Sequence, residues 1–245
     1  MARKFPDDIR RELSEAGKRD EIEKVSEESR RFMDRGRAAK KNYAERLSKA
    51  LAQKVADALR PRFKGILPDE QGARHESRAR TAKGVKKLDV NYSTPELGLG
   101  LGISIKTINF PDPGTGRYTK NYTRVDNELR AEAADYHGRQ PYAVLAALIF
   151  LPGDATKDGK TGPSSFKQAW NIFRYRAGRN STSDDATLFE SVYLGLYETE
   201  PDEMGNIAFI NFSEVPPDRG RPNGTLNFSE VLEEIAATFN RRNQT

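Results

Sequence analysis

The sequence contains no cysteine, and only His75 and His137 are histidines among its 245 residues. The lack of cysteine excludes disulfides, thiolate-bound zinc and a thiol nucleophile. Two histidines also argue against a metal site built from several imidazoles. Any bound metal is therefore expected to be a hard cation held by oxygen ligands.

Long apolar stretches are missing as well. No run reaches the roughly 18 apolar residues that a membrane-spanning helix needs. The first residues, MARKFPDDIRRELSEAG, lack the apolar segment of a signal peptide. From these two absences we expect a soluble, cytoplasmic protein without a membrane partner.

Charged residues make up 31% of the chain and hydrophobic residues 36%, and the mean hydropathy is -0.78. This composition can form a core, but it predicts an unusually charged surface. The formal net charge is +5 and the isoelectric point is about 9.3, which favours anionic partners, nucleic acid first. Many basic proteins bind no nucleic acid, so charge alone does not decide the class.

The order of apolar patterns predicts an α/β fold with a mixed central sheet flanked by helices. Residues 1–42 have few apolar positions and are expected to form a charged helical extension, with residues 43–245 as one domain. The domain begins with an amphipathic helix that Pro61 ends. Its apolar residues recur at a spacing of four: Leu47, Leu51, Val55 and Leu59.

Residues 64–84 are rich in arginine and read as a loop or a short helix. Strands are expected in 85–94, 97–110, 141–152, 187–199 and 205–212, and helices in 123–139, 165–179 and 226–243. The segment 141–152 is the most apolar of the chain, which is typical of a buried central strand. The three glycines of LGLGLGISIKT are expected to permit a close backbone approach or a bend in the strand.

Two residues in the first two expected strands suggest a catalytic site. Asp89 lies within the first strand and Lys106 at the end of the second, so neighbouring strands would bring the acid and the lysine together. Phosphodiester hydrolysis uses carboxylates to hold Mg²⁺ and a lysine to orient water and stabilise negative charge. The simpler alternatives are a solvent-facing Asp89 and a lysine that protects an edge strand.

Asp89 and the triplet Ser104-Ile105-Lys106 resemble the motif of the PD-(D/E)xK nuclease superfamily, the restriction-endonuclease-like proteins. The resemblance spans residues 43 to 151, with Ser104 in place of the usual acid. Some members with S-x-K take the second acid from the following helix, where an arginine precedes it. Arg124 and Glu128 fit that pattern here, and Glu132 lies one turn further on the same face.

The resemblance implies a restriction-endonuclease-like core and a Mg²⁺-dependent DNA endonuclease, with Mn²⁺ able to substitute. Asp89 and Glu128 would hold the metal, and Lys106 and Ser104 would complete the catalytic set. A type II restriction-like or anti-phage defence role and a homodimer or higher homo-oligomer follow by analogy. The alternatives are a nucleic-acid-binding protein on the same fold without catalysis, and a helical partner-interaction protein.

Basic residues beside the candidate site are expected to contact DNA phosphates. They are Arg78, Arg80, Lys83, Lys86, Lys87 and Arg124. A solvated protein face is the alternative interpretation of this cluster. Three further acids are weaker candidates for the site: Glu45 on the first amphipathic helix, Asp69 in a loop, and Glu96 in a turn.

Overall fold

The computed structural model describes residues 37–73, 77–199 and 205–243. Its centre is a five-stranded sheet in the order β3-β4-β5-β6-β7. The strands are β3 (Val90–Thr94), β4 (Gly98–Thr107), β5 (Val144–Pro152), β6 (Ser191–Tyr197) and β7 (Ile207–Ile210). The inner pairs β4–β5 and β5–β6 are parallel, and the outer pairs are antiparallel. The predicted α/β fold with a mixed sheet is confirmed.

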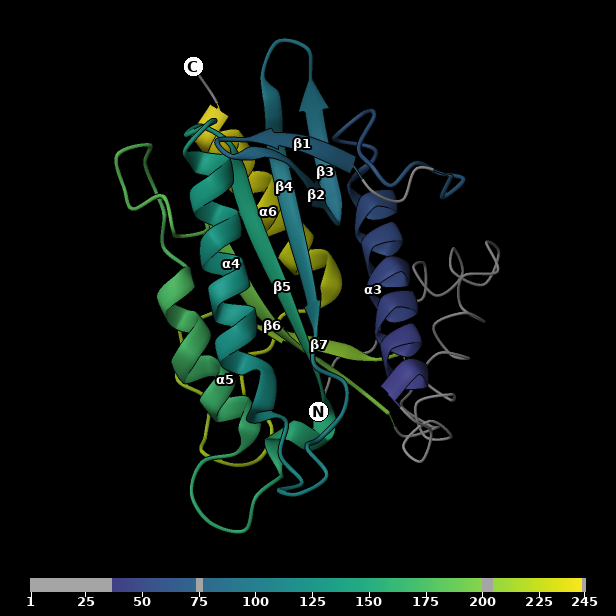
Figure 1. Cartoon of the computed structure of the whole chain (residues 1–245). Helices are drawn as coiled ribbons and strands as arrows, with labels where there is room; N and C mark the ends of the chain where they lie inside the picture. The colour runs from purple at the N-terminus through teal and green to yellow at the C-terminus, as the bar shows by residue number, and fades with distance from the viewer. Residues whose placement is uncertain (1–36, 74–76, 200–204, 244–245) are drawn as a thin grey trace.

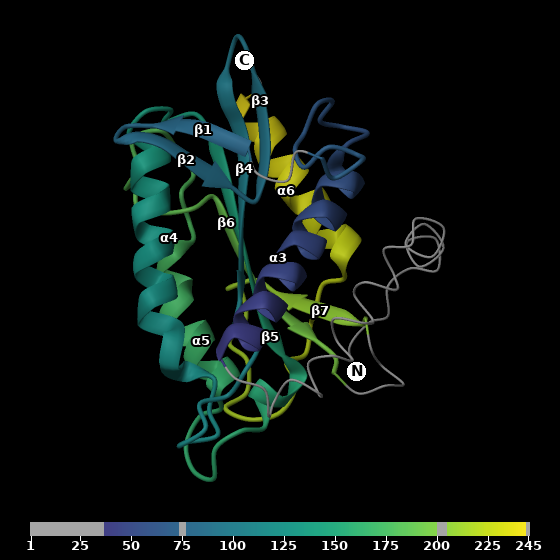
Figure 2. The same cartoon turned by 45° about the vertical axis from the view of Figure 1, so that its right-hand side comes forward.

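Helices cover both faces of this sheet (Figures 1 and 2). One face packs against α3 (Arg37–Leu59) and α6 (Phe228–Asn243), and the other against α4 (Tyr122–His137) and α5 (Ser165–Phe173). Short 3-10 helices adjoin them: η1 (Thr119–Asn121), η2 (Gly153–Thr156) and η3 (Arg174–Arg176). A charged helical extension was expected at residues 1–42, and residues 1–36 of it lie outside the described residues. The rest of that range, from Arg37, is the beginning of α3.

The sequence correctly predicted the central elements. Every residue of β5 is buried, as the apolar run from 141 to 152 indicated. The helix expected at 123–139 is α4, and the closing helix is α6. Within the described ranges, no helix is both long enough and apolar enough to cross a membrane.

The single strand expected over 85–94 is wrong, because two strands occupy this segment. β1 (Ser77–Thr81) and β2 (Gly84–Leu88) form a separate antiparallel hairpin, and β3 starts only at Val90. Leu88 packs with the core under α4, whereas Val90 packs with the core under α3. Residues two apart in a continuous strand share a face, so the strand must break between them, at Asp89. β1 occupies residues 77–81 of the segment 64–84, which was expected to be a loop or a short helix, whereas residues 64–73 form turns and loop as expected.

Gly102 explains how the hairpin fits against the sheet. A Cβ atom at this position would lie 2.9 Å from side-chain carbons of both Leu88 and Leu145. A Cβ at Gly100 would lie 3.2 Å from the ring of Phe239. The glycines of β4 therefore permit the close approach that the sequence predicted.

Candidate functional site

The alternation of side chains along β4 divides its residues between two environments. Ile103 and Ile105 point into the core under α3 and α6. Ser104 and Lys106 share the opposite face, which α4 covers, because strand residues two apart point the same way. Ser104 is 2% exposed, and the side chain of Lys106 is 16% exposed.

Glu132 of α4 contacts both of these side chains. The hydroxyl of Ser104 donates to Glu132 Oε2 at 2.7 Å, and Lys106 Nζ donates to Glu132 Oε1 at 2.6 Å. The carboxylate is only 23% exposed, so its ion pair with Lys106 is shielded from bulk water. Each oxygen of Glu132 thus has one protein donor.

Glu128 lies one helical turn before Glu132 and has a different main partner. Arg124 Nη1 donates to Glu128 Oε1 at 2.5 Å, whereas Lys106 Nζ lies 3.9 Å from Glu128 Oε2. The Glu128 side chain is 40% exposed. The sequence interpretation chose Glu128 as the second acid, but the structure brings Glu132 into direct contact with Ser104 and Lys106. Arg124, expected at DNA, pairs with Glu128.

Asp89 joins the same group from the junction between β2 and β3. Val90 is paired with Ile103, so the residue before it lies alongside Ser104. The backbone N–H of Ile105 donates to Asp89 Oδ2 at 2.7 Å. Asp89 and Glu132 are therefore bonded to consecutive residues of β4, and Asp89 reaches this strand at Ile105, between Ser104 and Lys106.

Tyr136 is a member of this group that the sequence interpretation missed. It is 1% exposed, and burial raises the pKa of its hydroxyl, as do the nearby charges of Glu132, Asp89 and Asp135. Its position four residues after Glu132 places both side chains on one face of α4. That spacing was the available signal, but a tyrosine in this pattern is typical of core packing.

Asp89 and Glu132 are the carboxylates of this site that could hold a cation. Among the described residues, no group of three or more His, Cys, Asp or Glu could hold a metal ion, so these two carboxylates would need water to complete the coordination. Mg²⁺ commonly binds proteins in this way and keeps several of its waters. A carboxylate offers about four lone-pair sites, so the bonds that Glu132 accepts leave capacity for a cation.

Two of the lysines expected at DNA have acidic partners in the protein. Lys83 Nζ lies 3.3 Å from Asp135 Oδ1, and Lys86 Nζ pairs with Asp135 Oδ2. Hydrogen bonds from Lys86 and Lys83 lower the pKa of Asp135, although its burial opposes them. The backbone N–H of Ala82 also donates to the Asp135 carbonyl at 2.9 Å. These contacts attach the β1–β2 hairpin to α4.

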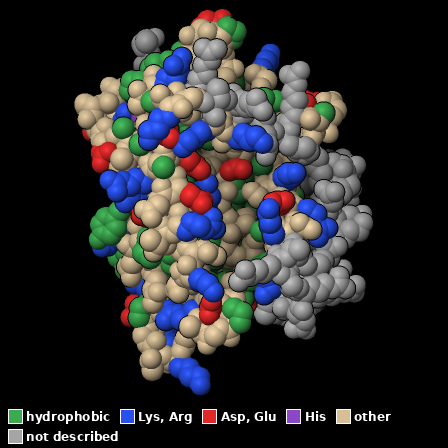
Figure 3. All heavy atoms as spheres, viewed as in Figure 1, with side chains coloured by type: hydrophobic (Ala, Val, Ile, Leu, Met, Phe, Trp, Pro, Cys, Tyr) green, Lys and Arg blue, Asp and Glu red, His purple; other side chains and the backbone are tan. Residues whose placement is uncertain are grey.

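The other predicted DNA contacts are less defined. Arg78 and Arg80 lie on β1, and their side chains are outside the described part of the structure. Lys87 is exposed. On the face seen in Figure 3, basic and acidic side chains are interspersed rather than separated into single-sign areas.

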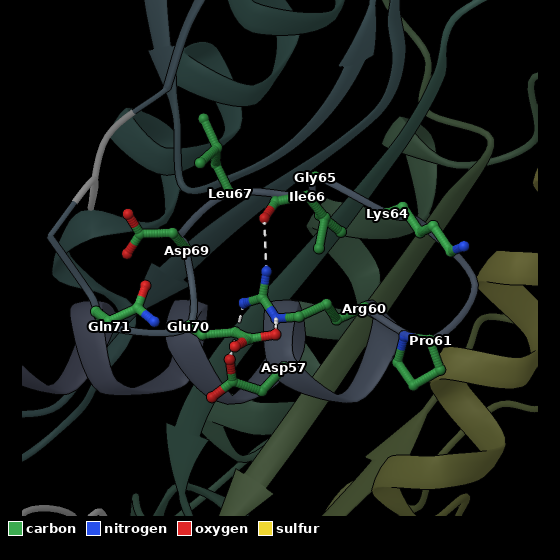
Figure 4. Close-up of a pocket in the computed structure, with 10 residues that line it drawn as sticks. All are labelled: Asp57, Arg60, Pro61, Lys64, Gly65, Ile66, Leu67, Asp69, Glu70 and Gln71. Atoms are coloured by element: carbon green, nitrogen blue, oxygen red, sulfur yellow. Dashed lines mark hydrogen bonds and ion pairs between the residues drawn. The ribbon is translucent and has the colours of Figure 1, made fainter.

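The weaker acidic candidates have roles of their own. Asp69 lines a pocket at the end of α3 together with Arg60 and Glu70 (Figure 4). There Asp69 Oδ1 accepts from the N–H of Ala73 at 2.8 Å, and Arg60 donates to the Pro68 carbonyl at 2.8 Å. Glu45 is 56% exposed and pairs with Lys41, and Glu96 is exposed in the turn between β3 and β4.

Two of the arginines that follow α5 pair with acidic side chains of the protein, and one of these two is buried. Arg179 is 1% exposed, and its Nε lies 3.7 Å from a carboxylate oxygen of the fully buried Glu190. A buried carboxylate needs a compensating cation, which explains why this arginine points inward. Arg176 pairs with Asp126 of α4 at 2.7 Å.

Comparison with known proteins gives no relative: no family model, curated protein or solved structure matches this chain. The function is therefore inferred from the geometry of one group of residues: Asp89, Ser104, Lys106, Glu132 and Tyr136.

Proposed function

We propose that the protein is a Mg²⁺-dependent endonuclease that hydrolyses phosphodiester bonds in DNA. The observation that carries this proposal is the convergence of Asp89 and Glu132 on the end of β4, with Lys106 between the sheet and α4. Two carboxylates beside one shielded lysine are the groups that this hydrolysis requires.

Each residue has a distinct role in the proposed reaction. Asp89 and Glu132 would hold Mg²⁺, or Mn²⁺ in its place, and the ion would supply Lewis-acid activation of a phosphoryl oxygen and of a water. Lys106 donates hydrogen bonds to the attacking water or to the phosphoryl oxygen that gains negative charge. The water oxygen bonds to phosphorus and releases a proton to solvent as the bond to the leaving oxygen breaks, and the leaving oxygen takes up a proton from solvent.

The order of elements supports the same proposal. The resemblance to the PD-(D/E)xK superfamily implies a helix, a strand pair carrying the motif, a second helix and a buried strand. The chain provides α3, the β3–β4 hairpin, α4 and β5 in that order. By the same analogy we propose a restriction or anti-phage role and a homodimer that places one site at each DNA strand.

One observation favours a second candidate, a nucleic-acid-binding protein without catalysis. Both oxygens of Glu132 already accept bonds from Ser104 and Lys106, so the pair could serve only to fasten α4 to the sheet. Cation binding separates the two candidates, because only the nuclease needs Glu132 to accept a metal.

A plasmid-nicking assay tests the proposal. Wild-type protein should convert supercoiled DNA to the nicked or linear form with Mg²⁺ or Mn²⁺ and should stop when EDTA is added. Asp89→Asn and Glu132→Gln should remove cleavage while circular dichroism shows the native fold. Lys64→Met, at an exposed position in the loop after α3, is the control for altered surface charge and should cleave DNA. Metal-independent nicking, or full activity in Glu132→Gln, would refute the assignment.

A further inference from the structure

Tyr136 has an unused hydrogen-bond donor beside the candidate site. The residue is 1% exposed, and its hydroxyl has no hydrogen-bond partner among the residues that the structure describes. A buried polar group without a partner costs roughly 1–3 kcal/mol. A partner from outside the polypeptide, such as a bound water molecule, would remove this cost.

The location of the hydroxyl indicates what that partner contacts. Tyr136 follows Glu132 by one helical turn and packs in the core between α4 and the sheet. Glu132 contacts Ser104 and Lys106 of β4, and Tyr136 lies one turn further on the same face of α4, so its side chain is on the side of the helix that faces this part of the sheet. Burial raises the pKa of its hydroxyl, and the charges of Glu132 and Asp89 add to this effect. The hydroxyl stays protonated in this surrounding and can donate.

The existing bonds leave a donor role for Tyr136. Glu132 already accepts from Ser104 and Lys106, and Asp89 Oδ2 accepts from the N–H of Ile105. A further donor next to two carboxylates matches a water molecule that itself touches a cation, because such a water donates to carboxylates and accepts from a hydroxyl. Mg²⁺ held by two carboxylates keeps several waters of this kind.

We infer that Tyr136 is a positioning residue that donates a hydrogen bond to a water in the hydration shell of a divalent cation between Asp89 and Glu132. This inference rests on the proposed function, since it requires the cation. The ligand class is a hydrated hard cation, Mg²⁺ or Mn²⁺.

Tyr122 provides a matched control on the same helix. It is also 1% exposed, but its hydroxyl donates to the carbonyl of Ser165 at 2.9 Å. The two tyrosines are separated by about 21 Å along the helix axis, from the rise per residue of an α-helix. Replacing either with phenylalanine removes one hydroxyl and leaves the ring.

Isothermal titration with Mn²⁺ and thermal unfolding without metal separate the roles of the two hydroxyls. Tyr136→Phe should weaken Mn²⁺ binding about 10-fold, as measured for other groups that hold metal-bound water, and should keep or raise the melting temperature. Tyr122→Phe should bind Mn²⁺ as the wild type does and should melt about 2–4 °C lower, because it loses a satisfied buried hydrogen bond.

Glu132→Gln in the same titration distinguishes the two proposals. If Glu132→Gln weakens Mn²⁺ binding and Tyr136→Phe does not, the role of Tyr136 is refuted and the nuclease proposal stands. If the wild type binds no Mn²⁺, or if Glu132→Gln binds it unchanged, both proposals are refuted. Weakened binding in both variants, with unchanged binding in Tyr122→Phe, supports both.

Discussion

Lys106 Nζ and Glu132 Oε1 lie 2.6 Å apart, and this ion pair joins the end of β4 to the middle of α4. The pair has two consequences for function. It holds a carboxylate in a partly shielded position beside Asp89, and it makes the lysine a competitor for any cation that binds there. The first two predictions follow from these consequences.

The first prediction concerns which glutamate supplies the second carboxylate. Glu132→Gln should lower cleavage at least 100-fold, because it removes a charged ligand that Asp89 alone cannot replace. Glu128→Gln should keep activity within about 10-fold, because Glu128 is more exposed and bonds mainly to Arg124. Initial rates of plasmid nicking at saturating Mg²⁺ measure both effects. If Glu128→Gln loses more cleavage activity than Glu132→Gln does, Glu128 is the metal ligand instead of Glu132.

The second prediction separates metal binding from catalysis at Lys106. Lys106→Met should abolish cleavage yet bind Mn²⁺ roughly 3- to 10-fold more tightly, because a competing positive charge next to Glu132 is gone. Titration calorimetry and the nicking assay are run on the same preparation. Weaker Mn²⁺ binding in Lys106→Met would show that the lysine supports the metal site rather than competing with it. Lys64→Met, at an exposed position in the loop after α3, should change neither quantity by more than about two-fold.

The choice between Glu128 and Glu132 shows where sequence reasoning stops. The two residues are four apart and share a face of α4, so periodicity predicts that both point toward β4. Which of them reaches Lys106 depends on how far the helix is shifted along the sheet. That shift is set by tertiary packing, for example by the burial of Leu129 and Ala133 of α4 in the core against the sheet, and no local pattern encodes it.

Other parts of the fold were within reach of the sequence. β5 and α4 were predicted because their apolar patterns are long and regular. The break at Asp89 was missed, because one continuous strand was predicted over 85–94, with Leu88 and Val90 both in it. A continuous strand would place them in one core, but two cores exist, and their number is a property of the whole fold.

The third prediction concerns the glycine at the centre of β4. Gly102→Ala should destabilise the protein by about 1–3 kcal/mol, because the added methyl group would overlap side chains of Leu88 and Leu145 at 2.9 Å. Urea denaturation measures the loss. The double variant Gly102→Ala with Leu88→Ala should recover part of it relative to Leu88→Ala alone, because the new methyl group then fills vacated space. If the losses of unfolding free energy in the two single variants simply add in the double variant, the steric explanation is contradicted.

The fourth prediction concerns Lys86, which the sequence suggested as a DNA contact. Asp135 is 3% exposed, and Lys86 and Lys83 are its cationic partners. Lys86→Met should therefore lower the free energy of unfolding by about 1–2 kcal/mol, with Lys83 still compensating part of the buried charge. Lys87→Met, next in sequence but exposed, should cost less than about 0.5 kcal/mol. If Lys86→Met retains full stability and instead reduces the salt dependence of DNA binding, the original DNA role applies.

The fifth prediction is a pH dependence of stability that comes from Lys54 on α3. Lys54 is 4% exposed, its ammonium group lies 5.0 Å from the centroid of the Phe228 ring, and burial lowers its pKa from 10.5 to about 7. Between these two values the unfolded chain binds more protons at this residue than the folded protein does. The free energy of unfolding should therefore rise with pH in this window, by up to about 1.4 kcal/mol per pH unit from this group.

Below pH 7 the folded protein must keep a buried charge, so the destabilisation caused by Lys54 is fully present there. Lys54→Met should accordingly be more stable than the wild type at pH 6, and the difference should shrink as the pH is raised toward 9. Urea denaturation at pH 6, 7, 8 and 9 measures both curves. Lys49→Met, at an exposed position of the same helix, should retain the wild-type slope. If the curves of Lys54→Met and the wild type run parallel across this range, burial of the Lys54 ammonium group does not control the pH dependence.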